Sequence, residues 1–217
     1  MKQDRNHLIA ELATDLSPVS NAGSTVGMLS LWLLVMVSLS AAVLLVTGDL
    51  RGDPLVQLRG SWQFALESAL GAAVVVAFAA AALRSAIPST VHPARAGALA
   101  MGLFVCWCGL MIYGLTDSAL PASMHGKREG CWLDTVMLGI PGILLGIWAV
   151  NRLWPLRRAW VGAWIGASAG AVPALLMQFS CMYDPAHNLQ HHLLPGMLVI
   201  PVGAALGAFL IRRRTGM

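Results

Sequence analysis

The sequence has very few charged residues, and this limits the class of protein to which it can belong. Asp, Glu, Lys and Arg make up only 11% of its 217 residues, whereas hydrophobic residues make up 57%. Soluble domains carry about 25% charged residues, and a mean hydropathy of +0.70 is far above what a soluble core of this length needs. The composition therefore excludes a soluble globular domain and predicts an integral membrane protein.

The sequence also lacks the alternation of apolar and polar residues that transmembrane β-strands require, which excludes a β-barrel. It contains six apolar runs of about 20 residues, the length at which an α-helix crosses about 30 Å of hydrocarbon. In lipid the backbone groups of such a run must bond within the run itself, as they do in a helix. We predict an all-α fold, an integral membrane bundle of six transmembrane helices at residues 26–46, 62–83, 96–116, 131–150, 159–183 and 193–211.

The N-terminal sequence does not have the features of a cleavable signal peptide, because residues 1–23 are largely polar and no small-residue cleavage motif clearly follows the first apolar run. The gaps between the runs are too short to hold a soluble domain. We therefore expect two parts: an N-terminal tail at residues 1–23, and a transmembrane domain at residues 24–214 whose first helix stays as an anchor.

Lysine and arginine are distributed unequally between the two sides of the predicted bundle, and this inequality sets the orientation of membrane proteins. If both termini lie on one side, that side carries ten basic residues and the opposite side carries four. The ten are Lys2, Arg5, Arg84, Arg95, Arg152, Arg157, Arg158, Arg212, Arg213 and Arg214, and the four are Arg51, Arg59, Lys127 and Arg128. Both termini are therefore predicted to be cytoplasmic.

The net charge of +4 does not indicate a nucleic-acid-binding protein. The basic residues flank the apolar runs as membrane anchors, and no basic stripe with interleaved aromatic residues is present. We expect contact with membrane lipid and no direct contact with nucleic acid.

Cysteines are few, and the four present fall into two kinds. Cys106 and Cys108 lie in the middle of a run and point about 200° apart on a helix, so they cannot share a metal ion and are expected to be packing residues. Cys131 and Cys181 each lie at the end of a run, and Leu156 in the turn "NRLWPLRRA" is midway between them. In an antiparallel hairpin with helices about 8–10 Å apart, these two thiols come to equal depth at its open end.

Potential metal ligands follow Cys181 in "CMYDPAHNLQHHLLPG". Asp184 and Pro185 are typical of a helix N-terminus, and His187 and His191 then lie four residues apart on one helix face. Thiols and imidazoles suit zinc, cadmium or copper, and His125 in the facing loop can join them. The metal ligands predicted from the sequence are therefore Cys131, Cys181, His187 and His191, with a solvated loop as the alternative.

These motifs resemble the NrsF-type family, which consists of integral membrane negative regulators of sigma factor F. The resemblance is carried by "LIAELATDLSPVS", "GCW", "RLWPLRRAWVGAWIGASAGA" and "CMYDPAHNLQHHLLPG" and covers essentially the whole chain. It implies a six-helix anti-sigma factor of the bacterial inner membrane that holds an extracytoplasmic-function sigma factor inactive. It further implies that Cys131 and Cys181 take part in the response to heavy metals such as chromium or cadmium.

The tail has features of a partner-binding segment. Leu8, Leu12 and Leu16 recur every four residues with Ile9 beside them, which predicts a short amphipathic helix. Such a helix is too short to be stable alone, but it can fold by laying its apolar face into a groove of a partner. Three acidic residues make an anionic lipid surface the less favoured alternative.

Three functions are compatible with these features. The favoured one is a non-enzymatic anti-sigma factor in which a metal or an oxidant acts on the sensor residues Cys131 and Cys181, shifts the helices and alters how the tail holds the sigma factor. No cofactor is expected beyond a transient heavy-metal ion at these cysteines. The alternatives are a membrane thiol-disulfide oxidoreductase, which needs accessible redox cysteines, and a metal transporter, which needs ligands at mid-depth.

Overall fold

The computed structural model describes residues 2–14, 24–47, 51, 54–88, 93–124 and 126–211. Every regular element within these ranges is helical, so the predicted all-α fold class is confirmed. Six of the helices are long and apolar enough to cross a membrane, with mean hydropathies between 1.4 and 2.5. They are α2 (Thr25–Thr47), α4 (Trp62–Ala86), α5 (Pro93–Tyr113), α6 (Cys131–Val150), α7 (Arg158–Ser180) and a last helix over Pro185–Leu210.

The last long helix begins earlier than the apolar run from which it was predicted. It consists of α8 (Pro185–His187), the π-helical segment η1 (Asn188–Leu193) and α9 (Leu194–Leu210). Asp184 caps its N-terminus, because Oδ1 of Asp184 accepts a hydrogen bond of 2.9 Å from the backbone N–H of Ala186. The predicted cap is therefore present, and it places the histidine-rich stretch on the helix rather than in a loop.

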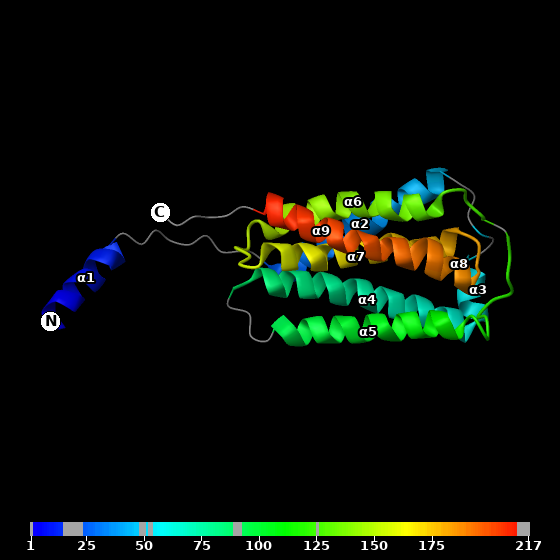
Figure 1. Cartoon of the computed structure of the whole chain (residues 1–217), viewed down its shortest axis with the longest axis horizontal. Helices are drawn as coiled ribbons and strands as arrows, with labels where there is room; N and C mark the ends of the chain where they lie inside the picture. The colour runs from blue at the N-terminus through cyan, green and yellow to red at the C-terminus, as the bar shows by residue number, and fades with distance from the viewer. Residues whose placement is uncertain are drawn as a thin grey trace.

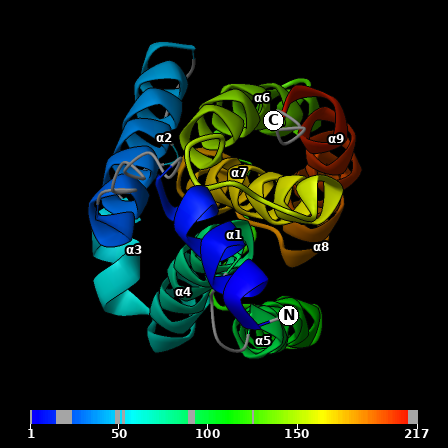
Figure 2. The same cartoon turned by 90° about the vertical axis from the view of Figure 1, so that its left-hand side faces the viewer.

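Helix α7 lies in the middle of the bundle and packs against α4, α6 and α9 (Figures 1 and 2). In the most apolar stretch of α7, 78% of the residues are buried, whereas in that of α2, at the edge of the bundle, only 22% are buried. The small residues of α7 allow this central position: a Cβ atom added to Gly166 would lie 2.6 Å from the carbonyl oxygen of Val199 on α9. A Cβ atom added to Gly162 or Gly170 would likewise meet the backbone of α9.

The two ends of the bundle differ in what they carry (Figure 1). Helix α2 begins and α9 ends at one end, where the turn between α6 and α7 also lies. The opposite end holds the start of α6, the end of α7, α8 and the short helix α3 (Pro54–Gly60). The start of the first long helix and the end of the last one therefore lie at the same end of the bundle. Cys131 and Cys181 lie at the opposite end.

Helix α1 (Lys2–Thr14) lies away from the bundle (Figure 1), and the side chains of Leu8 and Ile9 are 55% and 57% exposed. A helix is thus present in the tail, with two of its apolar residues uncovered, but its apolar and polar residues are not clearly separated onto two faces as an amphipathic helix requires. Leu12 is on this helix, but its side chain lies outside the part of the structure that is described, as does the whole of Leu16.

Candidate functional site

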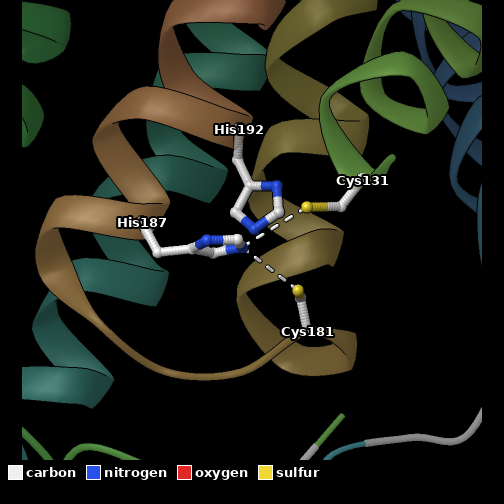
Figure 3. Close-up of side chains that lie close together, drawn as sticks. All are labelled: Cys131, Cys181, His187 and His192. Atoms are coloured by element: carbon white, nitrogen blue, oxygen red, sulfur yellow. Dashed lines mark hydrogen bonds between the residues drawn. The ribbon is translucent and has the colours of Figure 1, made fainter. Parts of the chain in front are cut away.

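Four side chains with metal-ligating atoms meet at the end of the bundle opposite the start of α2 (Figure 3). Cys131 is the first residue of α6, Cys181 follows the last residue of α7, His187 ends α8, and His192 lies in η1. One ligand atom from each residue lies within 4.8 Å of the others. Within the described ranges, this is the one group of three or more cysteine, histidine or acidic residues close enough to hold a metal ion.

His187 lies between the two thiols (Figure 3). Its Nε2 atom is 3.3 Å from Sγ of Cys131 and 3.4 Å from Sγ of Cys181. Both cysteines are free and almost fully buried, at 1% and 0% exposed. Two thiols from different helices therefore share one imidazole nitrogen, and this confirms the expectation that the hairpin brings Cys131 and Cys181 to equal depth.

The sequence around each cysteine holds it in place. Gly130, which precedes α6, has φ = 79°, a left-handed conformation that glycine adopts at little cost. The hydroxyl of Thr135 donates to the carbonyl oxygen of Cys131, and the backbone N–H of Cys181 donates to the carbonyl oxygen of Met177. The two thiols are thus fixed by the first turn of α6 and the last turn of α7.

The second histidine of the cluster differs from the one predicted. His191 does not join the cluster; its ring stacks on that of His187, with centroids 4.4 Å apart and planes 13° apart. His192 takes its place, because η1 is π-helical and a π turn closes hydrogen bonds from residue i to i+5. In a regular α-helix, residues five apart such as His187 and His192 would point about 140° apart. No motif in the sequence indicates this wider turn.

The environment of the thiols favours ionisation of one of them. The neighbouring Cys131 thiol lowers the pKa of Cys181 below its ordinary value, and this effect outweighs burial, which raises it. A thiolate, rather than a thiol, is the form of cysteine that binds metals and attacks electrophiles. Of the two sulfurs, that of Cys181 is therefore the one whose surroundings favour the thiolate.

A buried polar network anchors the segment that carries Cys181. The hydroxyl of Tyr183 donates to the carboxylate of Glu67 on α4 at 3.0 Å, and the side-chain amide of Gln178 donates to the same carboxylate at 3.1 Å. Glu67 is completely buried. Burial, and then Glu67 itself, raise the pKa of Tyr183, so its phenol remains a donor.

Arg51 covers this network from the loop before α3. Its Cζ atom is 5.1 Å from the ring centroid of Phe64 and 5.2 Å from that of Tyr183, in cation–π geometry. Its backbone N–H donates to the carbonyl oxygen of Ser180, next to Cys181. Burial lowers the pKa of this guanidinium. Nothing in the sequence pattern distinguished Arg51 from the other basic residues between runs.

A hollow of about 620 Å³ opens beside the cluster and reaches Cys131 and His187. Glu129 and Asp184 lie in its wall, together with His191. The hollow thus reaches two of the four residues of the cluster. His125, a further predicted ligand, lies outside the described residues.

The other two cysteines are not part of this site. Cys108 packs against the bundle core, whereas Cys106 is exposed on its outer surface. Their opposite directions are those expected for residues two apart on a helix.

The fold and the cluster together define a small helical protein with the build of a multi-pass membrane protein, which carries a buried thiol–imidazole site at one end. Residues 12–212 match the family model NrsF, described as negative regulator of sigma F. Because the match covers nearly the whole chain, the chain belongs to this family, and the resemblance seen in its sequence is confirmed. Comparisons with curated proteins and with solved structures gave no significant match.

Proposed function

We propose that this chain is a membrane-embedded anti-sigma factor that sequesters an extracytoplasmic-function sigma factor and releases it under heavy-metal or oxidative stress. Family membership supports negative regulation of a sigma factor. The observation that carries the sensing role is the approach of Sγ of Cys131 and Sγ of Cys181 to one nitrogen of His187, at 3.3 and 3.4 Å. The proposed mechanism has no catalytic step.

The outer surface of the bundle supports insertion into a bilayer. Large apolar side chains face outward along its length, among them Leu34, Val105 and Leu144, which are 64%, 63% and 48% exposed. In water such a surface would favour aggregation. Exposed tryptophans lie near both ends, as in the aromatic belts of membrane proteins; they are Trp62, Trp132, Trp154 and Trp160.

The arrangement of the ends supports an orientation with both termini in the cytoplasm of a bacterium. The side that carries ten of the fourteen lysines and arginines is the side of both termini. The cluster of Cys131 and Cys181 then faces the periplasm, where thiol oxidation is chemically favoured. The α1 helix lies on the cytoplasmic side, where a sigma factor is found.

Signal transmission requires that the signal favours one of two bundle states. A change in the separation of Cys131 and Cys181 can favour one state over the other, because one sulfur moves with α6 and the other with α7. Helix α7 contacts α4, α6 and α9, so its displacement reaches most of the bundle. The cytoplasmic ends of these helices then alter how the tail presents Leu8 and Ile9 to the sigma factor.

A thiol-disulfide oxidoreductase is the second candidate, and the lowered pKa of Cys181 next to a second thiol favours it. Against it, both thiols are almost fully buried, whereas exchange needs a sulfur that a partner can reach. A metal transporter is less favoured, since the ligand cluster of the described residues lies at one end of the bundle and not at mid-depth.

The test is purification of the full chain from the membranes of its host under reducing conditions, followed by mass spectrometry of the proteins that it retains. The proposal predicts a sigma subunit in near-equal amount, which dissociates when cadmium is added. Recovery of the chain without a sigma subunit, together with turnover of a dithiol substrate, would identify the oxidoreductase instead.

A further inference from the structure

We propose that Cys131, Cys181, His187 and His192 form a four-ligand site for one thiophilic divalent ion of the zinc group, Zn²⁺ or Cd²⁺, in tetrahedral coordination. The inference names the ligand set and the ion class of the sensor, and its regulatory meaning rests on the proposed function. Binding of the ion itself does not depend on a sigma factor, so the two can be tested apart.

The distances within the cluster match those of a tetrahedral site. Zn–S bonds of about 2.3 Å and Zn–N bonds of about 2.0–2.1 Å place a sulfur and a nitrogen about 3.5 Å apart at tetrahedral angles. Nε2 of His187 is 3.3 Å and 3.4 Å from the two sulfurs. Since all four ligand atoms lie within 4.8 Å of one another, an ion can draw them together through small side-chain rotations.

His192 provides an independent observation. Its imidazole is only 2% exposed and is directed toward the cluster (Figure 3). Neither of its ring nitrogens makes a hydrogen bond of standard geometry among the described residues, and the polar group that interacts with the ring is the thiol of Cys181, itself a member of the cluster. An unpaired polar group this deeply buried costs free energy, and coordination of an ion by one of these nitrogens removes the cost. The ring is therefore placed as a ligand and not as an ordinary core side chain.

The ligand types select the ion. Two thiolates and two imidazoles in tetrahedral geometry are typical of zinc, and thiolate ligands suit the softer cadmium ion as well. Magnesium and calcium prefer oxygen ligands, and no carboxylate belongs to this cluster. Four protein ligands fill the coordination shell, as in structural zinc sites, and leave no open position for a substrate.

The ion would join three long helices, namely α6, α7 and the last helix, which consists of α8, η1 and α9. Cys131 contributes the start of α6, Cys181 the end of α7, and the two histidines come from α8 and η1. The hollow beside the cluster gives the ion a route inward, and Glu129 and Asp184 in its wall are anionic groups that attract a cation. Binding and loss of the ion therefore act directly on the contacts between α6, α7 and the last helix.

The site is tested with the purified full chain in detergent, stripped of metal under reducing conditions and titrated with Co²⁺ as a spectroscopic probe. We expect one Co²⁺ per chain, with intense d–d bands of a tetrahedral ion and a thiolate-to-cobalt charge-transfer band. Both signals should disappear when Zn²⁺ or Cd²⁺ is added. Weak octahedral bands, or no saturation at one ion per chain, would overturn the proposal.

Two histidine variants test whether His192 or His191 is the fourth ligand. Loss of an outer-shell partner already weakens metal sites by about 10–100-fold, so removal of a direct ligand in His192→Ala should cost more than about 100-fold in affinity. The neighbouring variant His191→Ala should bind as the unmodified chain does. The opposite result, with His191→Ala impaired and His192→Ala unaffected, would contradict the assignment.

Cys131→Ser keeps the size of the side chain and serves as a second variant in case His192→Ala does not fold. It should weaken the charge-transfer band by about half, because one of two thiolate ligands is lost. An unchanged band would overturn the proposal. Retention of the sigma subunit is measured on the same samples. If the chain retains sigma but binds no Co²⁺, the metal site alone is refuted. If the chain binds Co²⁺ but retains no sigma, the proposed function alone is refuted.

Discussion

Nε2 of His187 lies 3.3 Å from Sγ of Cys131, although the two residues are 56 positions apart in the chain. The same nitrogen lies 3.4 Å from Sγ of Cys181, only six positions away. One imidazole thus links the first residue of α6 to the segment that follows α7. A chemical change at the two sulfurs therefore acts directly on the contact between the start of α6 and the end of α7.

The exposed apolar side chains Leu8 and Ile9 of α1 are predicted to bind the sigma factor. Leu8 is 55% exposed, and Leu8→Asp places a charge where an apolar contact is expected, so sigma retention in pull-down should fall by at least about tenfold. Ala10→Asp is the matched control, because residue 10 points about 200° away from residue 8 on a helix. If both variants retain sigma equally, or if deletion of residues 2–16 has no effect, the tail is not the binding segment.

The close approach of α7 and α9 is predicted to limit the size of residue 166. Gly166→Ala puts a Cβ atom 2.6 Å from the carbonyl oxygen of Val199 and 3.1 Å from Cα of Ile200. Both are backbone atoms and can move little, so the free energy of unfolding should fall by about 1–3 kcal/mol. Unfolding in mixed micelles measures this change.

Gly109→Ala on α5 is the control for this substitution, because a Cβ atom there meets no heavy atom within 4 Å. Alanine favours helix over glycine by up to about 1 kcal/mol, so this variant should be as stable as the unmodified chain or slightly more stable. Equal losses in the two variants would show that packing against α9 is not the cause.

The hydroxyl of Tyr183 is predicted to hold the segment after Cys181 against α4. Tyr183→Phe keeps the ring beside Arg51 but removes a donor to Glu67, a carboxylate that is completely buried. Loss of a partner to a buried polar group costs about 1–3 kcal/mol, and alkylation of Cys181 should become faster as the segment loosens. Thermal unfolding and thiol labelling measure these two effects.

The chain has one other tyrosine, and it provides the control. The hydroxyl of Tyr113 bonds to the exposed carboxylate of Asp117 at 3.1 Å, so Tyr113→Phe should change stability by less than about 0.5 kcal/mol. An equal effect of the two substitutions would argue against a special role for the Tyr183–Glu67 contact.

Much of this fold could be predicted from the sequence, because lipid-spanning helices have a length and composition that few other elements share. The positions of Cys131 and Cys181 about the turn at Leu156 predicted their approach, since two antiparallel helices bring residues that are equally far from the turn to equal depth. Asp184 and Pro185 predicted the start of the last helix, because capping depends on neighbours in the sequence.

The rest depends on contacts that a local pattern does not contain. His191 was expected beside the two cysteines on the assumption of a regular helical period, and the π-helical turn brings the imidazole of His192 there instead. No local pattern indicates that the carboxylate of Glu67 is buried against Tyr183 and Gln178, more than a hundred residues further along the chain. Such long-range pairs require the folded arrangement of α4 and α7.

The most direct test of the central claim is the release of the sigma factor from the purified complex by cadmium, measured as the fraction that dissociates in a pull-down at increasing Cd²⁺. The account predicts release from the unmodified chain and from the control Cys106→Ser/Cys108→Ser, whose cysteines lie outside the cluster. It predicts no release from Cys131→Ser/Cys181→Ser, since both thiolate ligands are gone. Release from this last variant at the same Cd²⁺ concentration would contradict the claim that these two cysteines are the sensor.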